Sequence, residues 1–324
     1  MSITPVFIFS APRSGSTLVQ RVLAAHEGVA TSSEPWILLP MLTPLRGDVP
    51  VRTQLDALVG EAVEDFLRAL PGGRADYLAA VRSAALALYS EVAGGDAGWF
   101  VDKTPPYHLV VDEIVEAFPE GRFIFLWRNP LSLVASAVEL FDGGRWEVNR
   151  YTSALFESIE YLVPASRRYA DVSYCVRFED LVRDGEPRWR SLLEYVGVPF
   201  EPRALERFSA VGLEGRMGDP SGPRLYQRVD QEPLEKWRRT IHTSVRRAWC
   251  RRYLRWIGDD RLNHMGYDPA ALLGELDAPV RPSLADLDDA RRLVASLARD
   301  SVKRVVPPHS GGRSVWADLV RRRR

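Results

Sequence analysis

Lysine and cysteine are both scarce in this chain of 324 residues. Only three of its 43 basic residues are lysines, namely Lys103, Lys236 and Lys303, and its only cysteines are Cys175 and Cys250. Two cysteines far apart in the chain, without a CxxC spacing, argue against a disulfide framework and against a cysteine-bound metal. We therefore expect two buried thiols in a reducing compartment.

Net charge and long hydrophobic runs are missing as well. Lys+Arg and Asp+Glu both number 43, so the formal net charge is zero. This balance argues against a nucleic-acid partner. The apolar run near the start, residues 6–9, is too short for a signal peptide or a transmembrane segment. The sequence therefore predicts a cytoplasmic protein without a transmembrane segment.

The end of the chain departs from this charge balance. It closes on a run of arginines from Arg321 to Arg324. We expect this run to be solvated. The alternative is a weak contact with a membrane surface, because each arginine near anionic lipid contributes about 1 kcal/mol.

Apolar and amphipathic segments alternate along the chain. Short apolar runs predict strands at residues 6–9, 99–102, 123–127 and 172–178. Apolar residues spaced three and four apart predict helices at residues 51–70, 75–93, 107–118, 147–170, 243–257 and 284–306. This alternation predicts an α/β fold, a three-layer sandwich in which a central, mostly parallel sheet is flanked by helices. Ligands of such sheets bind beyond the carboxyl ends of the strands.

The first strand is followed by a small-residue loop, SAPRSGST, and then by a helix that runs to about residue 26. Unpaired N–H groups and the dipole at a helix N-terminus make an anion site. Glycine lets the backbone approach a phosphate, and the side chains around it add donors; the residues concerned are Arg13, Ser14, Gly15, Ser16 and Thr17. The loop lacks the lysine of a GxxxxGK[ST] motif. Magnesium-dependent phosphoryl transfer is therefore disfavoured, and we expect no metal.

A second candidate phosphate site follows the strand at residues 123–127. Arg128 stands at the end of this strand, and Ser136 lies eight residues later on the next helix, close to the face where that helix begins. An arginine with a serine hydroxyl can grip a phosphate with two parallel hydrogen bonds. Two phosphate sites on neighbouring strand ends predict a nucleoside ligand with phosphates at both ends.

Together these motifs resemble those of the PAPS-dependent sulfotransferases, in particular the bacterial and tyrosylprotein branch. These enzymes transfer a sulfuryl group from 3′-phosphoadenosine 5′-phosphosulfate (PAPS). Their 5′-phosphosulfate loop is similar to SAPRSGSTLVQRVLAAH, and their 3′-phosphate motif is similar to FIFLWRNPLSLVASAV. Their DKTP segment resembles VDKTPPYH, and two further likenesses are FEDLVRD and EKWRR. The resemblance spans roughly residues 4–260 and implies a P-loop-type three-layer fold.

The resemblance implies a sulfotransferase domain over residues 1–277, followed by a helical, basic tail over residues 278–324. The helical segment 51–93 lies between nucleotide motifs and is a candidate cover for a substrate. The same holds for the glycine- and proline-rich segment 213–233.

The resemblance also implies which residues hold the cofactor PAPS and its product, adenosine 3′,5′-bisphosphate. The residues that would bind the 5′-phosphosulfate are Arg13, Ser14, Gly15, Ser16 and Thr17. Arg128 and Ser136 would bind the 3′-phosphate, and Trp237 and Arg238 would cover the nucleotide.

Four residues are implied in the chemistry. The branch with a glutamate shortly after the first helix uses it as general base, and here that residue is Glu34. Charge builds on the bridging oxygen of the leaving nucleotide, and Arg13 and Lys103 would stabilise it. His108, just after the DKTPP segment, is a rival base, and Lys103 has an alternative role as an ion-pair partner of Asp102 or Glu34.

The reaction implied is sulfuryl transfer to a hydroxyl group of a small-molecule, glycan or lipid acceptor, by in-line attack with a carboxylate base. A homo-oligomer is compatible with the sequence. Two alternatives stay open: a magnesium-dependent P-loop kinase or other phosphotransferase, and a non-catalytic nucleotide-binding module.

Overall fold

The computed structural model describes residues 3–46, 54–95, 97–213, 231–277 and 283–305. Most of the expected loop at 213–233 and the run from Arg321 to Arg324 lie outside the described residues. None of the helices in the described ranges is long and apolar enough to cross a bilayer.

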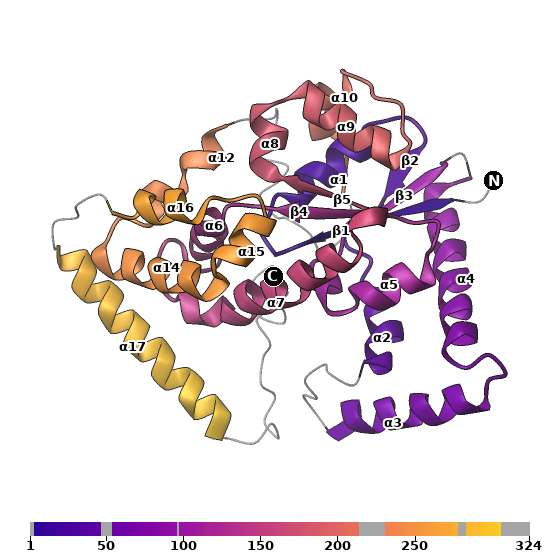
Figure 1. Ribbon diagram of the computed structural model, residues 1–324, viewed down its shortest axis with the longest axis horizontal. Coiled ribbons are helices and arrows are strands. Elements are labelled where there is room, and N and C mark those ends of the chain that lie inside the picture. The colour runs from indigo at the N-terminus through magenta and orange to yellow at the C-terminus, as the bar shows by residue number, and fades with distance from the viewer. Residues whose placement is uncertain (1–2, 47–53, 96, 214–230, 278–282, 306–324) are drawn as a thin grey trace.

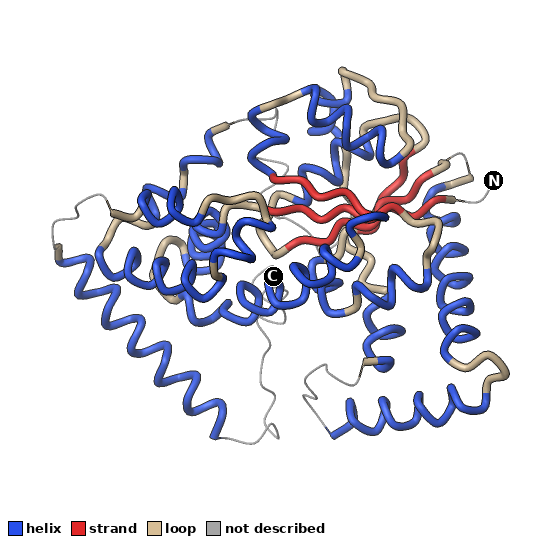
Figure 2. Tube along the Cα trace, in the orientation of Figure 1, coloured by secondary structure: helices blue, strands red, loops and turns tan. Residues whose placement is uncertain are grey.

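A five-stranded sheet forms the centre of the molecule (Figures 1 and 2). Its strands are ordered β2-β3-β1-β4-β5, and all neighbours pair in parallel. Four of them were predicted, and their bounds are Thr4–Ser10 (β1), Trp99–Asp102 (β3), Arg122–Trp127 (β4) and Ser173–Arg177 (β5). The fifth, β2 (Val29–Thr31), was not predicted, because three half-buried residues are too few to show a period. The expected parallel α/β sheet is therefore confirmed.

Side-chain alternation places a hydrophobic core on each face of the sheet. On β1, Phe7 and Phe9 point into one core, whereas Val6 and Ile8 point into the other. The residues of β4 alternate in the same way, and Ile124 pairs with Ile8 in the register of the two strands. Strands buried on both faces read as continuous apolar runs, which is why these segments were recognisable in the sequence.

Helices cover both faces, so the molecule has three layers (Figure 1). One face is covered mainly by α1 (Ser16–Ala24), α8 (Phe178–Arg183), α9 (Glu186–Val196) and α10 (Ala204–Arg207). The other face is covered mainly by α2 (Leu38–Leu42), α4 (Arg74–Ala93), α5 (Val111–Ala117), α6 (Pro130–Asp142), α7 (Thr152–Arg168) and α14 (Ser244–Ile257).

The remaining helices are short or peripheral. The α-helices are α3 (Gln54–Ala69), α12 (Glu232–Glu235), α13 (Trp237–Thr240), α15 (Asp259–His264), α16 (Pro269–Glu275) and α17 (Leu284–Val305). The 3₁₀ helices are η1 (Thr43–Leu45), η2 (Pro105–Leu109), η3 (Val148–Tyr151), η4 (Ala170–Val172) and η5 (Phe208–Ala210). The single helix expected at 107–118 is divided into η2 and α5, because Val110 has a non-helical backbone, with φ −137° and ψ 30°.

The two helices expected within 51–93 play different parts. Helix α4 belongs to the core layer: it buries Leu78, Val81 and Ala85, and its Tyr89 ring stacks on Phe100 with 4.3 Å between centroids. Helix α3 lies apart from the sheet, below α2 in Figure 1. Of these two helices, only α3 therefore lies away from the core and remains available as a cover.

Helix α17 agrees with the helix expected at 284–306, and its first turns are docked on the main body. Asp289, which is 2% exposed, accepts hydrogen bonds from Thr243 Oγ1 at 2.7 Å and from Arg246 Nε at 2.8 Å. Asp286 likewise accepts from the backbone N–H of Ser244 at 2.7 Å. A buried ion pair thus joins the start of the expected tail to α14.

The expectation of two buried thiols is wrong for one cysteine. Cys250 is buried in α14, but Cys175 is exposed on β5. The reason is that β5 is an edge strand of the sheet, which the apolar pattern alone does not reveal.

Candidate active site

The sequence-predicted side chains gather where the parallel strands end. Arg13 to Gly15 lie in the loop after β1, and Ser16 and Thr17 begin α1; Lys103 follows β3, and Arg128 follows β4. Helices α1 and α6 begin at the same edge. The carboxyl edge of a parallel sheet is where such folds bind ligands.

The turn between β1 and α1 has a backbone conformation that few residues can adopt. Arg13 and Gly15 both have positive φ, 73° and 87°. A Cβ atom on Gly15 would lie 2.3 Å from the Phe178 ring, so only glycine fits. No side chain caps α1, and the first N–H groups of a helix have no carbonyl partner within it. The buried hydroxyl of Ser14 also has no hydrogen-bond partner.

The two predicted phosphate sites contact each other. The Arg128 guanidinium donates through Nη1 to the carbonyl of Arg13 at 2.7 Å and through Nη2 to the carbonyl of Pro233 at 3.3 Å. It also lies 4.8 Å from the centroid of the Phe178 ring. The Arg13 side chain reaches the second site, since its Nε donates to Ser136 Oγ at 3.3 Å. Residues more than a hundred positions apart therefore form one cationic cluster.

Glu34 and Lys103 form a buried ion pair. Lys103 Nζ lies 2.6 Å from Glu34 Oε1, and the two side chains are only 2% and 8% exposed. The other carboxylate oxygen, Oε2, accepts a hydrogen bond from the Trp36 indole at 3.1 Å. Both oxygens of Glu34 are thus fixed in direction. The sequence offered Asp102 and Glu34 as partners of Lys103, and its ammonium group contacts Glu34.

A second buried carboxylate, which the sequence named only as a possible partner of Lys103, lies beside this pair. Asp102 is fully buried and accepts hydrogen bonds from Tyr89, Tyr107 and Thr104 hydroxyls. Burial raises the pKa of Asp102 to about 6. Burial, together with the nearby Asp102 charge, also raises the pKa of Tyr89 and Tyr107 well above the usual value. In the sequence, Asp102 stood out only as part of the DKTPP segment and as a possible partner of Lys103.

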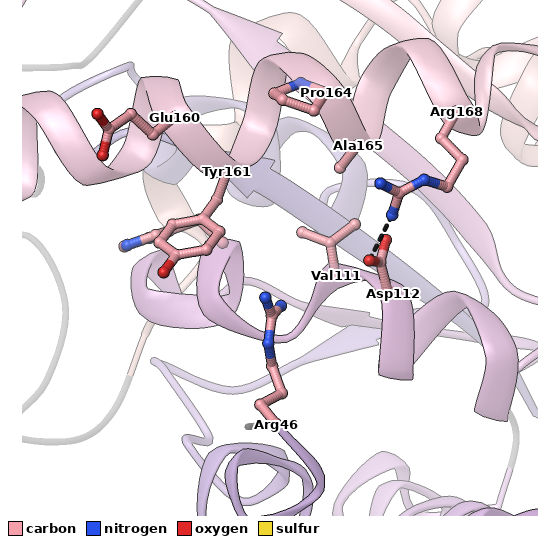
Figure 3. Close-up of a pocket in the computed structure, with 9 residues that line it drawn as sticks. Arg46, Val111, Asp112, Glu160, Tyr161, Pro164, Ala165 and Arg168 are labelled. Atoms are coloured by element: carbon pink, nitrogen blue, oxygen red, sulfur yellow. Dashed lines mark hydrogen bonds and ion pairs between the residues drawn. The ribbon is translucent and has the colours of Figure 1, made fainter. Parts of the chain in front are cut away.

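His108 lines a pocket of about 210 Å³ beside α7. Its Nδ1–H donates to the carbonyl of Pro105 at 3.0 Å, and its ring centroid lies 6.1 Å from that of Tyr161. Burial lowers the pKa of His108 to about 4. Figure 3 shows Tyr161 of α7 facing Arg46 in this pocket, whereas Arg168, also on α7, pairs with Asp112.

The residues predicted to cover the nucleotide lie on α13, which packs against α6. Trp237 is buried, whereas Arg238 is exposed. The Arg238 guanidinium pairs with Glu235 and Glu275 and stacks 4.8 Å from the centroid of the Trp237 ring. Within the described ranges, no three His, Cys, Asp or Glu side chains gather as a metal site.

Comparisons with known proteins extend these observations. A family model described as "Sulfotransferase family" matches residues 5–202. Nodulation protein NoeE of Sinorhizobium fredii is 35% identical over 132 residues, which are 40% of this chain and 30% of NoeE. Protein-tyrosine sulfotransferase 1 of Danio rerio is 24% identical over 303 residues, which cover 90% of this chain and 79% of that protein.

Among solved structures, the sulfotransferase domain of the Synechococcus PCC 7002 olefin synthase superposes with a TM-score of 0.51. It has 25% sequence identity, and the match covers 73% of this chain and 88% of that domain.

Proposed function

The chain belongs to the sulfotransferase family, and from this premise we propose that it transfers a sulfuryl group from PAPS to a hydroxyl group of an acceptor. The observation that carries the proposal is the single cationic cluster made by the β1–α1 turn and Arg128. A nucleotide with phosphates at both ends of its nucleoside needs two anion sites of this kind, joined at one edge of the sheet.

The residues present fit this nucleotide. The Ser14 hydroxyl has no hydrogen-bond partner, and no side chain caps the first backbone N–H groups of α1, so both are donors available to an anion. The Phe178 ring fills the space that a side chain at Gly15 would need and so closes that side of the turn. Residues 13–17 would hold the 5′-phosphosulfate, and Arg128 with Ser136 would hold the 3′-phosphate. PAPS supplies an activated sulfuryl group, bonded through a bridging oxygen to the 5′-phosphate.

Glu34 is the proposed general base. It takes the proton of the acceptor hydroxyl as the hydroxyl oxygen bonds to sulfur and the bond from sulfur to the bridging oxygen breaks. A carboxylate in this role typically contributes about 10²–10⁴-fold. Lys103 and Arg13 stabilise the negative charge left on the bridging oxygen. We assign the role to Glu34 rather than to His108, because Glu34 contacts Lys103 whereas His108 packs towards Tyr161.

Trp237 and Arg238 are the proposed cover of the nucleotide. Two contacts support this assignment: the carbonyl of Pro233 accepts a hydrogen bond from Arg128, and Thr240 of α13 donates to Glu139 of α6 at 2.9 Å. The outlying helix α3 remains the candidate cover of the acceptor.

The proposed acceptor is a hydroxyl of a small molecule, a glycan or a lipid. The name of the zebrafish relative adds the tyrosine hydroxyl of a protein as a competing acceptor. We further propose a cytoplasmic enzyme that needs no metal. The free thiols Cys175 and Cys250 support a reducing compartment.

Calorimetry with nucleotides tests the proposal. We expect the protein to bind adenosine 3′,5′-bisphosphate without magnesium and more tightly than ATP. The variant R128A should lose about 10- to 100-fold in affinity for the bisphosphate, because a hydrogen bond to a charged group contributes roughly 1.5–3 kcal/mol. Its affinity for adenosine 5′-phosphate should change much less. R188A, on the exposed surface of α9, is the control and should change neither affinity.

Two results would contradict the proposal. An equal loss for both nucleotides in R128A would remove Arg128 from the 3′-phosphate site. Tighter binding of ATP with magnesium would favour the kinase alternative. A screen of acceptors with labelled PAPS then separates an active enzyme from a non-catalytic module, which would transfer nothing.

A further inference from the structure

The carboxylate of Asp102 collects three hydroxyl donors from separate parts of the chain. Its Oδ2 accepts from Tyr89 at 2.6 Å and from Tyr107 at 2.9 Å, and its Oδ1 accepts from Thr104 at 3.0 Å. The ammonium of Lys103, the next residue, points instead to Glu34. Asp102 therefore accepts hydrogen bonds from hydroxyl groups, and the ammonium of Lys103 is not among its hydrogen-bond donors.

For two of these hydroxyls, Thr104 and Tyr107, this arrangement fixes which partner receives the proton and which group each oxygen accepts from. A hydroxyl has one proton, and a proton given to Asp102 leaves only lone pairs for other partners. Thr104 Oγ1 then accepts the backbone N–H of Trp36 at 3.3 Å, and the Tyr107 oxygen accepts that of Leu38 at 3.4 Å. A chain of hydrogen bonds thus connects the Asp102 carboxylate to the backbone N–H groups of Trp36 and Leu38.

The segment held in this way carries the proposed base. Trp36 has a left-handed backbone, with φ 59°, a conformation that a non-glycine residue keeps only when its surroundings enforce it. Its indole N–H in turn donates to Glu34. The residues before Glu34 are held from the other side by Gln20 of α1, whose amide donates to the carbonyls of Ser32 and Ser33 at 2.6 and 3.0 Å.

We propose that Asp102 is a positioning residue, which acts through Thr104 and Tyr107 to hold Glu34 where it can accept the proton of the acceptor. The inference rests on the proposed function, because it requires Glu34 to be the base. Tyr89 shares the Asp102 carboxylate, but no hydrogen bond joins it to residues 34–38 within the described part of the chain. The two tyrosines therefore form a matched pair.

The test compares Thr104→Val with Thr104→Ser, and Tyr107→Phe with Tyr89→Phe. Sulfuryl transfer from labelled PAPS to 4-nitrophenol is measured, with sulfate release to water as the background reaction. T104V should lower kcat by about 10- to 100-fold, since a misplacement near 1 Å can have an effect of this size. Its KM for PAPS should stay within about threefold, and T104S, which keeps the hydroxyl, should restore kcat. Y107F should lower kcat more than Y89F does.

A second readout does not depend on an acceptor. Amide hydrogen exchange at Trp36 should be faster in T104V than in T104S or the wild-type protein, and exchange at Leu38 should be faster in Y107F than in Y89F. Calorimetry with adenosine 3′,5′-bisphosphate checks that each variant is folded. The aspartate itself is tested by D102N, which replaces one accepting oxygen with an N–H donor. At least one of the three hydroxyls then loses its acceptor, so kcat should fall as in T104V.

The outcomes separate this inference from the proposed function. Equal kcat and equal amide exchange in T104V and T104S, or in Y107F and Y89F, would overturn the positioning role. Undiminished turnover in E34Q would instead overturn the assignment of the base. A loss of bisphosphate binding as large as the loss of kcat would show a general structural effect and would also overturn the inference.

Discussion

Charged side chains that are almost completely buried define the site at the scale of single residues. Glu34 and Lys103 face each other at 2.6 Å, and Arg128 is 7% exposed. Burying such groups is unfavourable unless each one meets a partner of opposite charge or a set of hydrogen bonds. The partners are present here, and the arrangement points their charges towards one edge of the sheet.

The role of Glu34 gives the prediction at this scale. E34Q keeps the size of the side chain and a carbonyl oxygen that can accept from Lys103, but it removes the base. We expect kcat to fall by about 10²–10⁴-fold, while the calorimetric affinity for adenosine 3′,5′-bisphosphate stays within about threefold. E34A should have a similar kcat and a lower stability by about 3–5 kcal/mol, because it leaves the buried Lys103 unpaired.

Near-normal turnover in E34Q would move the base role to another residue. His108 would be the next to test, by H108F. A fall in bisphosphate affinity that matches the fall in kcat would mean that Glu34 supports the nucleotide site rather than the proton transfer.

At the scale of elements, the junction between β1 and α1 forms the proposed 5′-phosphosulfate site. The strand ends at Ser10, the helix begins at Ser16, and the turn between them contains two residues with positive φ. The ring of Phe178, at the start of α8, packs directly against this turn. The junction is therefore shaped by a helix that is distant in the sequence.

G15A tests this junction. The added methyl group would lie 2.3 Å from the Phe178 ring at a backbone φ of 87°. We expect G15A to lower the melting temperature and to weaken adenosine 3′,5′-bisphosphate by tenfold or more in calorimetry, because the turn must shift. The matched control is G197A, at the same φ of 87° but with no heavy atom within 4 Å.

The control isolates the close contact from backbone strain. G197A should destabilise the protein by about 1 kcal/mol through the left-handed conformation alone, and it should leave nucleotide affinity unchanged. Equal effects of the two variants on affinity would mean that the Phe178 contact does not shape the anion site.

At the scale of the whole molecule, stability should depend on pH through the buried Asp102. Burial raises its pKa from 3.8 to about 6, so the folded protein binds this proton more strongly than the unfolded chain does. The contribution is fully present below pH 4 and is lost as pH rises to about 6, by about 3 kcal/mol in total. His108 acts in the opposite direction, because burial lowers its pKa to about 4.

Urea unfolding of the wild-type protein and D102N from pH 4 to pH 7.5 measures this dependence. The difference between the two free energies of unfolding should shift in favour of D102N by up to about 3 kcal/mol as pH rises, and should level off above pH 7. The difference removes groups that titrate in both proteins. A constant difference across this range would mean that Asp102 is ionised in the folded protein throughout.

Much of this architecture was readable from local patterns. Continuous apolar runs predicted four of the five strands, and the residues Arg13 to Thr17 and Arg128 lie at the carboxyl ends of β1 and β4, as expected. Their role in binding phosphate stays a prediction. Helix α17 was predicted almost to the residue. The strand β2 and the break at Val110 were missed, because a three-residue strand and a single non-helical residue leave no periodic signal.

By itself, the sequence determined the α/β fold, the parallel sheet and the residues at its carboxyl edge, because each depends on spacing over a few neighbouring positions. Only the tertiary structure decided that Lys103 pairs with Glu34, 69 positions away, that Asp102 gathers Tyr89 and Tyr107, and that His108 turns towards α7. These choices depend on how helices and strands pack, since packing sets the direction of each side chain and the partner within reach. No local pattern carries that information.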